Sequence, residues 1–382
     1  SGVQSLLLGY MDLIINALID QSTLDLPAPN DGLTATIYVK SGTYKESLPI
    51  VVPANTAIVG DELRGTTIEP EIIIKTYATS TSSNGNVVNV ISTQDLYDQC
   101  PIQFVSTGNT LEDFSGVTAG QTYYVIGDSI TETSFTISLS PGGEEYTLSN
   151  NFGNMYVYGG DALKNMFYMQ NATGLRNCTL NGLLGTLTEL NEWQTRRPTG
   201  GAYVSLDPGT GPDDTSAWIS KRSPYIQNVT TFGYGCVGMK IDGTLHNGGN
   251  KSMVSNDFTQ ILSDGIGLWI TGSGALTEAV SVFSYYCYAS YFAEDGARIR
   301  GTNGNSSYGT YGVIAEGFDI TENPVTGNVD NRTGQAIATV QSAFGQDSAL
   351  LKIQYQNAGE NYVTSTTNML QYSNQFDTVW ST

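Results

Sequence analysis

The stretch that decides the fold is Ile37-Tyr-Val-Lys-Ser-Gly-Thr-Tyr-Lys-Glu-Ser-Leu-Pro-Ile-Val-Val-Pro-Ala-Asn-Thr-Ala-Ile-Val-Gly60. It predicts short apolar strands at 37–39, 50–52 and 57–59, and a fourth strand near 66–68, separated by turns with Gly, Pro or Asn. Strands this short, closely spaced and rich in β-branched residues suit a coil in which each rung covers the previous one. The stretch therefore predicts an all-β chain built as a parallel β-helix.

Two short motifs carry a family resemblance. The turn Gly42-Thr-Tyr-Lys-Glu46, followed by Ile58-Val-Gly-Asp61 before Thr66-Thr-Ile68, resembles the opening of pectin-lyase-like chains, especially pectin methylesterases. The resemblance implies a right-handed parallel β-helix and is confined to residues 37–68.

Composition and charge limit the partners. The chain has 382 residues with 43 Gly, 23 Tyr and only 16 Lys+Arg, which is typical of a turn-rich β protein. A formal charge of −20 excludes nucleic acid and disfavours anionic membranes, because both need clustered cations. No apolar run approaches the ~20 residues that span a bilayer, and no secretory signal is recognised. We expect a secreted or particle-borne protein, and the start at Ser1 suggests a fragment or processed product.

Changes in residue pattern along the sequence divide the chain into parts. Leu and Ile at near-helical spacing over residues 5–20 predict a helix that caps the open end of the solenoid or joins a neighbouring subunit. The expected parts are a capping helix at 1–25, first rungs at 26–97, an inserted antiparallel β module at 98–158, the main β-helix at 159–320 and a C-terminal β module, complete or truncated, at 321–382.

An internal repeat supports the solenoid. Gly238-Met-Lys-Ile241, Gly267-Leu-Trp-Ile270 and Ala297-Arg-Ile-Arg300 align at spacings of 29 and 30 residues, a period typical of stacked rungs. A preceding strand repeats with them at 229–232, 258–261 and 282–285.

The cysteines predict neither a metal centre nor a cofactor site. Cys100, Cys178, Cys236 and Cys287 lack CxxC or Cys/His spacing, so we expect buried free thiols. The catalytic signatures of pectin methylesterases are missing. Polygalacturonase signatures are missing too, because the only histidine is His246, in Leu-His-Asn-Gly-Gly.

Two Asp-Gly turns are the candidate catalytic feature. If Asp264 and Asp295 stacked in adjacent rungs, their separation would approach the ~5.5 Å of retaining glycosidases. Glu294 would join them as a third acid, and Arg298 or Arg300 would bind an anionic sugar. The alternative is that Asp-Gly simply suits a tight turn, since both residues tolerate positive φ.

Other polar and aromatic residues have a structural and a functional interpretation. Asp213-Asp214 and Glu144-Glu145 read as solvated loop charges, with a calcium site at the first pair as the alternative. Trp193, Trp218, Trp269 and the tyrosines either pack between rungs or form a sugar-stacking surface, in which Trp269 would bind substrate.

A longer resemblance is to virion proteins of tailed phages that infect marine cyanobacteria and their relatives. It is carried by residues 166–182, with Asn171-Ala-Thr-Gly-Leu175, by residues 301–317, with Tyr308-Gly-Thr-Tyr-Gly312, and by Gly120-Gln-Thr-Tyr-Tyr-Val125. It implies a tail-fibre or baseplate-associated protein of the virion, assembled as a homotrimer with other virion proteins.

Three functions remain. The first is a non-enzymatic virion structural or host-adsorption protein that contacts host surface polysaccharide. The second is a tailspike-type depolymerase, either a polysaccharide lyase or a glycoside hydrolase, with Asp264, Glu294 and Asp295 as its acids. The third, a bacterial adhesin passenger, is disfavoured because no signal sequence is recognised. Missing catalytic motifs favour the first.

Overall fold

The computed structural model describes residues 35–188 and 196–316, together with the backbone of β26 (Gln335–Val340), β27 (Leu351–Gln356) and β28 (Tyr362–Ser365). The expected capping helix at 1–25 lies outside these residues. Helical structure within them is limited to short 3-10 turns at Thr110–Glu112, Gly127–Ser129, Asp161–Leu163 and Gly243–Leu245. No helix in this part of the chain is long and apolar enough to cross a bilayer.

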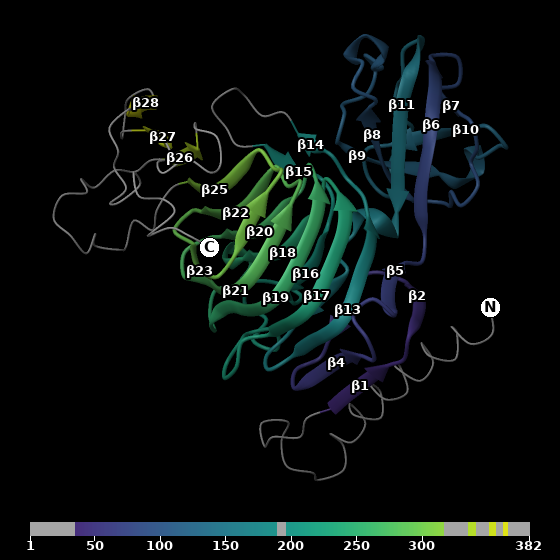
Figure 1. The fold of residues 1–382 in the computed structure, drawn as a ribbon. Coiled ribbons are helices and arrows are strands. Elements are labelled where there is room, and N and C mark those ends of the chain that lie inside the picture. The colour runs from purple at the N-terminus through teal and green to yellow at the C-terminus, as the bar shows by residue number, and fades with distance from the viewer. Residues whose placement is uncertain (1–34, 189–195, 317–334, 341–350, 357–361, 366–382) are drawn as a thin grey trace.

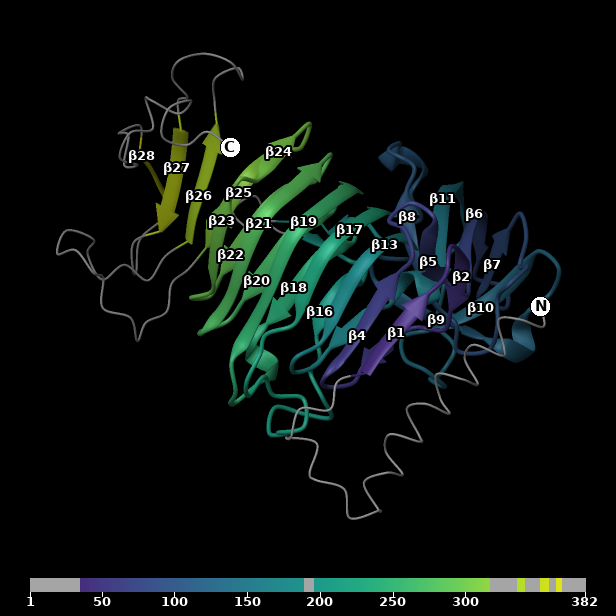
Figure 2. The same ribbon diagram turned by 60° about the horizontal axis from the view of Figure 1, so that its bottom comes forward.

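Two parallel sheets form a coil, with the chain passing from one to the other on each rung (Figures 1 and 2). Sheet A contains β1 (Ala35–Val39), β2 (Gly42–Glu46), β4 (Thr56–Gly60), β5 (Thr66–Pro70), β13 (Gly174–Leu183), β17 (Tyr225–Tyr234), β19 (Lys251–Ser263), β21 (Ala275–Tyr285), β23 (Arg298–Thr302) and β24 (Asn305–Ser307). Sheet B contains β3 (Ile50–Val52), β12 (Phe167–Met169), β16 (Ala202–Leu206), β18 (Val237–Asp242), β20 (Ile266–Thr271), β22 (Ala289–Glu294) and β25 (Tyr311–Glu316). The stacked parallel sheets agree with the predicted β-helix, and its right-handed sense follows the rule for parallel crossovers and stays a prediction.

Strands β26, β27 and β28 pair antiparallel with one another, and β26 pairs antiparallel with β25. This part of the expected C-terminal module therefore extends sheet B.

The long strands of sheet A bend at one residue each, and the chain bends at the same place between β23 and β24. The residues at the bend all have φ between 50° and 55° and lie side by side in the register: Asn177, Asn228, Asp257, Ser281 and Asn303. Asn and Asp tolerate this left-handed conformation better than other residues with a Cβ. Asn228 Nδ2 donates to Asn177 Oδ1 at 3.0 Å, and Asn303 Nδ2 donates to Ser281 Oγ at 3.1 Å. The bend turns each long strand around a corner of the coil.

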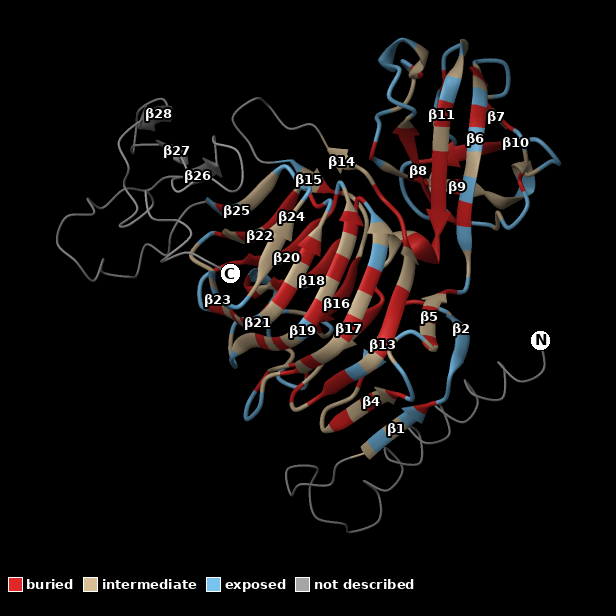
Figure 3. Ribbon diagram, viewed as in Figure 1, coloured by how far each residue is buried: buried red, intermediate tan, exposed pale blue. Residues whose placement is uncertain are grey.

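The interior of the coil is mainly apolar, but it includes buried polar residues such as Ser255 and Thr277 and a polar row formed by Thr231, Gln260 and Ser284 on neighbouring strands. Gln260 is fully buried, and its Oε1 accepts a hydrogen bond from Ser284 Oγ at 2.8 Å. Gly267 faces this row. A Cβ there would lie 2.4 Å from Gln260 Oε1 and 2.5 Å from the carbonyl oxygen of Ser290, so the position needs glycine. Figure 3 shows the buried residues along the strands of the coil.

The repeat is confirmed in part. Met239 pairs with Leu268 and Ile241 with Ile270, as the alignment of the first two units predicts. The third unit is wrong: β20 pairs with 289–294 on β22, whereas 297–300 belong mainly to β23 in sheet A. The cause is a shortening of the rungs, since Tyr225–Val254, Lys251–Ala275 and Leu276–Arg298 pair at 29, 24 and 22 residues.

An antiparallel barrel is inserted between β5 and β12. It is closed by β6 (Ile73–Ser82), β7 (Val87–Val90), β8 (Pro101–Ser106), β9 (Thr122–Ile126), β10 (Ser134–Ser138) and β11 (Asn151–Gly160). The module begins at Ile73, earlier than the expected residue 98, because β6 pairs with the distant β11 instead of with a rung. The barrel has a core of its own around Phe104, Tyr123 and Phe135.

The barrel is also tied to the coil. Gln103 of β8 exchanges hydrogen bonds with Thr199, which follows the small hairpin of β14 (Leu187–Thr188) and β15 (Arg197–Pro198).

Candidate functional site

The predicted catalytic pair is not assembled. We call the turns from sheet A to sheet B edge AB, and the turns from sheet B to sheet A edge BA. Asp264 follows β19 on edge AB, whereas Asp295 follows β22 on edge BA. Adjacent stacking of these two residues is therefore wrong, and the misaligned third repeat explains the error.

Both aspartates have the backbone that the turn interpretation requires. Their φ values are 55° for Asp264 and 53° for Asp295, and a glycine follows each. At edge AB, the first residue after a sheet A strand is left-handed in other rungs too: Gly235 after β17, Tyr286 after β21 and Tyr308 after β24. The backbone of both Asp-Gly turns thus fits the turn interpretation.

The two predicted sugar-binding arginines lie on β23 of sheet A. Arg298 and Arg300 are exposed, and Arg300 Nη1 lies 2.8 Å from Glu278 Oε1 in an ion pair at the surface. Both side chains therefore belong to a different sheet from Trp269, which lies on β20.

Two predicted residues do meet, on the outer face of sheet B. Trp269 lies on β20 and Glu294 ends the neighbouring strand β22. Trp269 Nε1 donates to Glu294 Oε1 at 2.7 Å, and the other carboxylate oxygen forms an ion pair with Arg197 of β15. Glu294 is only 8% exposed, so its charge is compensated where water hardly reaches.

Aromatic rings hold the guanidinium in place. Arg197 lies 4.5 Å from the ring centroid of Phe292 and 5.6 Å from that of Trp269, and these two rings stack at 6.0 Å. Lys240 lies 4.2 Å from the Trp269 ring, which adds a second cation–π contact. We call Arg197, Trp269, Phe292 and Glu294 the Arg197 clamp. It fixes the β14–β15 hairpin against sheet B.

The clamp alters the acidity of Glu294. Burial raises the pKa of this carboxyl, and the opposing effects of Arg197 and of the Trp269 hydrogen bond do not cancel it. A carboxylic acid with a raised pKa has the property of a general acid. A second carboxylate, Asp242, lies on the same outer face, and the register places Thr271 between them.

Sequence reasoning missed Arg197. Its only signal is that it is one of the few cations of an acidic chain, and no motif surrounds it.

The remaining acidic candidates make local contacts. Asp214 accepts hydrogen bonds from Thr210 and Ser216, and these lower its pKa to about 2. Asp213 accepts from Asn247 Nδ2 at 2.7 Å, linking two loops. No cluster of three or more His, Cys, Asp or Glu that could hold a metal occurs in the described residues.

The other predictions have mixed outcomes. All four cysteines are buried, as expected, with three of them in the core of the coil. Trp218 covers Gly248 and Gly249 in a loop contact. Trp193 lies outside the described residues.

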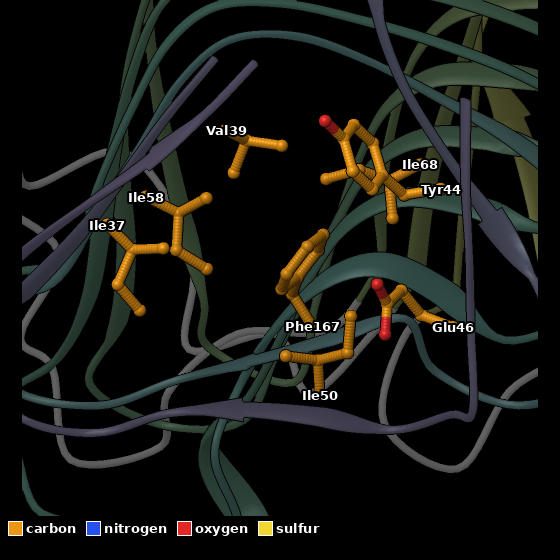
Figure 4. Close-up of a pocket in the computed structure, with 8 residues that line it drawn as sticks. All are labelled: Ile37, Val39, Tyr44, Glu46, Ile50, Ile58, Ile68 and Phe167. Carbon is orange, nitrogen blue, oxygen red and sulfur yellow. The ribbon is translucent and has the colours of Figure 1, made fainter. Parts of the chain in front are cut away.

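An apolar pocket opens at the first rungs of the coil. Figure 4 shows its lining: Ile37, Val39, Tyr44, Glu46, Ile50, Ile58, Ile68 and Phe167. Burial raises the pKa of Glu46, and the neighbouring Glu71 raises it further. The expected capping helix would cover this end of the coil, and that expectation stays a prediction.

Exposed aromatic side chains gather near edge AB. Phe232 and Tyr234 at the end of β17 are 39% and 53% exposed, and Tyr286 and Tyr308 in the turns are 52% and 79% exposed. The rings of Tyr286 and Tyr308 stack at 5.5 Å with an interplanar angle of 20°. We call these four residues the aromatic edge. The barrel rises from the same edge, because it joins β5 of sheet A to β12 of sheet B (Figure 1).

No family model and no curated protein matches the sequence. Solved structures that are distantly similar to the chain include three at 10% identity each. They are tailspikes of phages. The tailspike gp61 of Pseudomonas phage phi297 is matched over 73% of this chain and 65% of that chain, with a TM-score of 0.20. The tailspike gp54 of Acinetobacter baumannii bacteriophage AP22, in complex with A. baumannii capsular saccharide, is matched over 75% and 62%, with a TM-score of 0.16. The tailspike gp49 of Pseudomonas phage LKA1 is matched over 72% and 55%, with a TM-score of 0.20. The match thus spans less than two thirds of each tailspike chain.

Proposed function

We propose that this chain is a host-adsorption component of a phage particle that binds surface polysaccharide without cleaving it. The observation that carries the proposal is the aromatic edge, where two exposed rings at the end of β17 lie on the same edge of the coil as the stacked pair Tyr286 and Tyr308. Aromatic faces stack on the apolar faces of sugar rings, and a pair of rings that is already stacked loses little conformational entropy on binding.

The acidic residues favour binding over cleavage. Asp264 and Asp295 lie on different edges, and the buried Glu294 is engaged by Arg197 and Trp269. The sequence resemblance to virion proteins of tailed phages supports the placement in a particle, where a polysaccharide would be the first host surface encountered.

The test is to incubate the purified chain with acidic and neutral polysaccharides and to measure both binding and cleavage. Affinity electrophoresis reports binding, while new reducing ends and the absorbance of unsaturated products report cleavage. Retardation without products is the expected result. Absence of retardation on every polysaccharide would exclude the proposal.

The proposal includes assembly as a homotrimer with other virion proteins, as the resemblance implies. Light scattering should then give three times the chain mass of 40.9 kDa. A monomer at micromolar concentration would remove the trimer from the proposal.

One observation favours depolymerase activity as a second candidate. Glu294 has a raised pKa, and Asp242 lies two strands away on the same face, roughly 9–10 Å at the usual strand spacing. Inverting glycosidases separate their two carboxyl groups by about 6.5–9.5 Å. If cleavage occurs, Glu294→Gln and Asp242→Asn should abolish it, whereas Asp264→Asn should not.

A further inference from the structure

A cluster of tyrosines around one lysine lies where the barrel meets the coil. Lys75 and Tyr77 come from β6, and Tyr156 and Tyr158 come from β11 of the barrel. The antiparallel register places Tyr156 opposite Tyr77 and Tyr158 opposite Lys75. Tyr234, from the end of β17, completes the group from the coil. We call these five residues the Lys75 platform (Figure 1 shows β6 and β11 beside each other).

The rings surround the ammonium group. Lys75 Nζ lies 5.8 Å from the ring centroid of Tyr156 and 5.6 Å from those of Tyr158 and Tyr234. The rings of Tyr77 and Tyr156 approach to 4.5 Å, and those of Tyr156 and Tyr158 to 5.6 Å. Residues from two separately folded parts of the chain thus converge on one cation.

The platform has a fixed floor and an open rim. Tyr158 is buried and packs with Val105, Ala162 and Leu184 in an apolar cluster at the junction. The outer members, Tyr77, Tyr234 and Lys75 itself, are exposed. A ligand can therefore reach the ring faces and the ammonium together, on a support that needs no rearrangement.

Lys75 is a cation in a strongly acidic chain, and three tyrosine rings surround it. The formal net charge is −20, with 36 Asp+Glu against 16 Lys+Arg. Within the described residues, none of the ion pairs involves Lys75, and its recorded contacts are with the tyrosine rings. An exposed cation that no carboxylate neutralises is available to an anionic ligand, which the rest of the surface repels.

We propose that the Lys75 platform binds a segment of acidic polysaccharide. The carboxylate of one sugar unit accepts a charge-assisted hydrogen bond from Lys75, and the apolar faces of adjoining units stack on Tyr77 and Tyr234. This inference rests on the proposed polysaccharide-binding function and specifies its ligand class and position.

The experiment uses the full chain and affinity electrophoresis in gels that contain alginate, polygalacturonate or hyaluronan. Matched gels contain the same polymers after reduction of their carboxyl groups, or neutral dextran. The variants are Lys75→Met, Lys75→Arg, Tyr234→Ser and, as a control, Phe152→Ser. Phe152 is an aromatic residue on β11 with 91% exposure and no part in the platform. Circular dichroism checks that each variant is folded.

Lys75→Met should weaken binding to the acidic polymer by about tenfold or more, the effect expected for one charge-assisted contact, while Lys75→Arg retains it. Tyr234→Ser should weaken binding to the acidic and the carboxyl-reduced polymer alike, and Phe152→Ser should change neither.

The outcomes separate two failures. Unchanged binding of the acidic polymers by Lys75→Met, or binding of wild type to neutral polymers only, would overturn the platform and leave the proposed function standing, whatever the effect of Tyr234→Ser, because Tyr234 also belongs to the aromatic edge. Absence of wild-type binding to every polymer would overturn both.

Discussion

Replacing Arg197 with methionine should destabilise the protein by about 2–4 kcal/mol at pH 7. Removing one partner of a buried ion pair costs about 3–5 kcal/mol, because the other charge remains buried without compensation. The side chains of Arg197 and Glu294 are 24% and 10% exposed, so residual hydration reduces the cost. Methionine preserves much of the packing on Phe292, which isolates the effect of the charge.

The cost should depend on pH with a definite sign. The pKa of Glu294 is already raised in the folded protein, and loss of Arg197 should raise it further. A raised folded-state pKa stabilises the fold below the unfolded pKa of about 4.5, and this contribution is lost as pH rises through the folded-state value. The penalty of Arg197→Met should therefore be small near pH 4 and should increase toward pH 7.

Guanidinium denaturation at pH 4 and pH 7 measures these effects. The set comprises wild type, Arg197→Met, Glu294→Gln and the double variant, which form a double-mutant cycle. In the Glu294→Gln background, the cost of Arg197→Met should lose most of its dependence on pH. The double variant should be more stable at pH 7 than Arg197→Met alone. Arg300→Met is the matched control, because its exposed pair with Glu278 should contribute only about 0–1 kcal/mol.

Additive effects in the cycle, or an Arg197→Met penalty equal to that of Arg300→Met, would refute the clamp. Glu294 would then be free of Arg197 in solution, which would strengthen the case for a catalytic role.

Three further outcomes are expected. Gly267→Ala should lower the free energy of unfolding by about 2–3 kcal/mol, because the added Cβ has no space. Gly301→Ala, with no atom within 4 Å of the added Cβ, should be neutral or slightly stabilising. Denaturant titration measures both, and equal effects would contradict the packing of the polar row. Burial raises the pKa of the Cys178 and Cys287 thiols to about 12, so a disulfide reagent at pH 8 should react with them only after denaturation, and rapid native labelling would disprove their burial. Asn228→Ala should cost about 1–2 kcal/mol through left-handed strain and a lost hydrogen bond, and Asn228→Gly should cost less; the reverse order in thermal unfolding would rule out the bend.

Local pattern was enough to predict the coil. The strand at Ile50–Val52 and the pairing of the first two repeat units follow from short β-branched runs and Gly-containing turns. Parallel pairing of this kind joins equivalent positions of successive rungs, so a correct period gives a correct register. The rungs shorten from 29 to 24 and 22 residues along the chain, so a constant spacing of 29–30 residues no longer predicts the register. It therefore placed Asp295 on the wrong edge.

Long-range pairing limited the rest. The sequence of strand β6 has the same residue pattern as a strand of the coil. Only its antiparallel pairing with β11, in which Ile73 lies opposite Gly160 and Thr81 opposite Asn151, reveals a barrel. Glu294 and Trp269 were singled out for other reasons, and nothing in the sequence joined them to Arg197, about a hundred residues away in the chain. The Lys75 platform likewise combines β6, β11 and β17, which no local window contains.

The large insertions share one edge of the coil, and this has a physical basis. The barrel and the β14–β15 hairpin both leave sheet A and return to sheet B, on edge AB. A turn between sheets contributes little to the parallel ladders, so its extension leaves the pairing of the rungs above and below intact. An insertion still needs anchoring, which Gln103 supplies for the barrel and Arg197 for the hairpin. Because Tyr234 of the coil contacts Lys75 of the barrel, a ligand bound there would meet side chains that both parts of the fold hold in place. The relative rigidity of barrel and coil should therefore affect affinity. Thr199→Val removes the hydrogen bond to Gln103 Oε1 and leaves the Thr186 N–H without its acceptor, so it should lower both the affinity for polysaccharide and the free energy of unfolding.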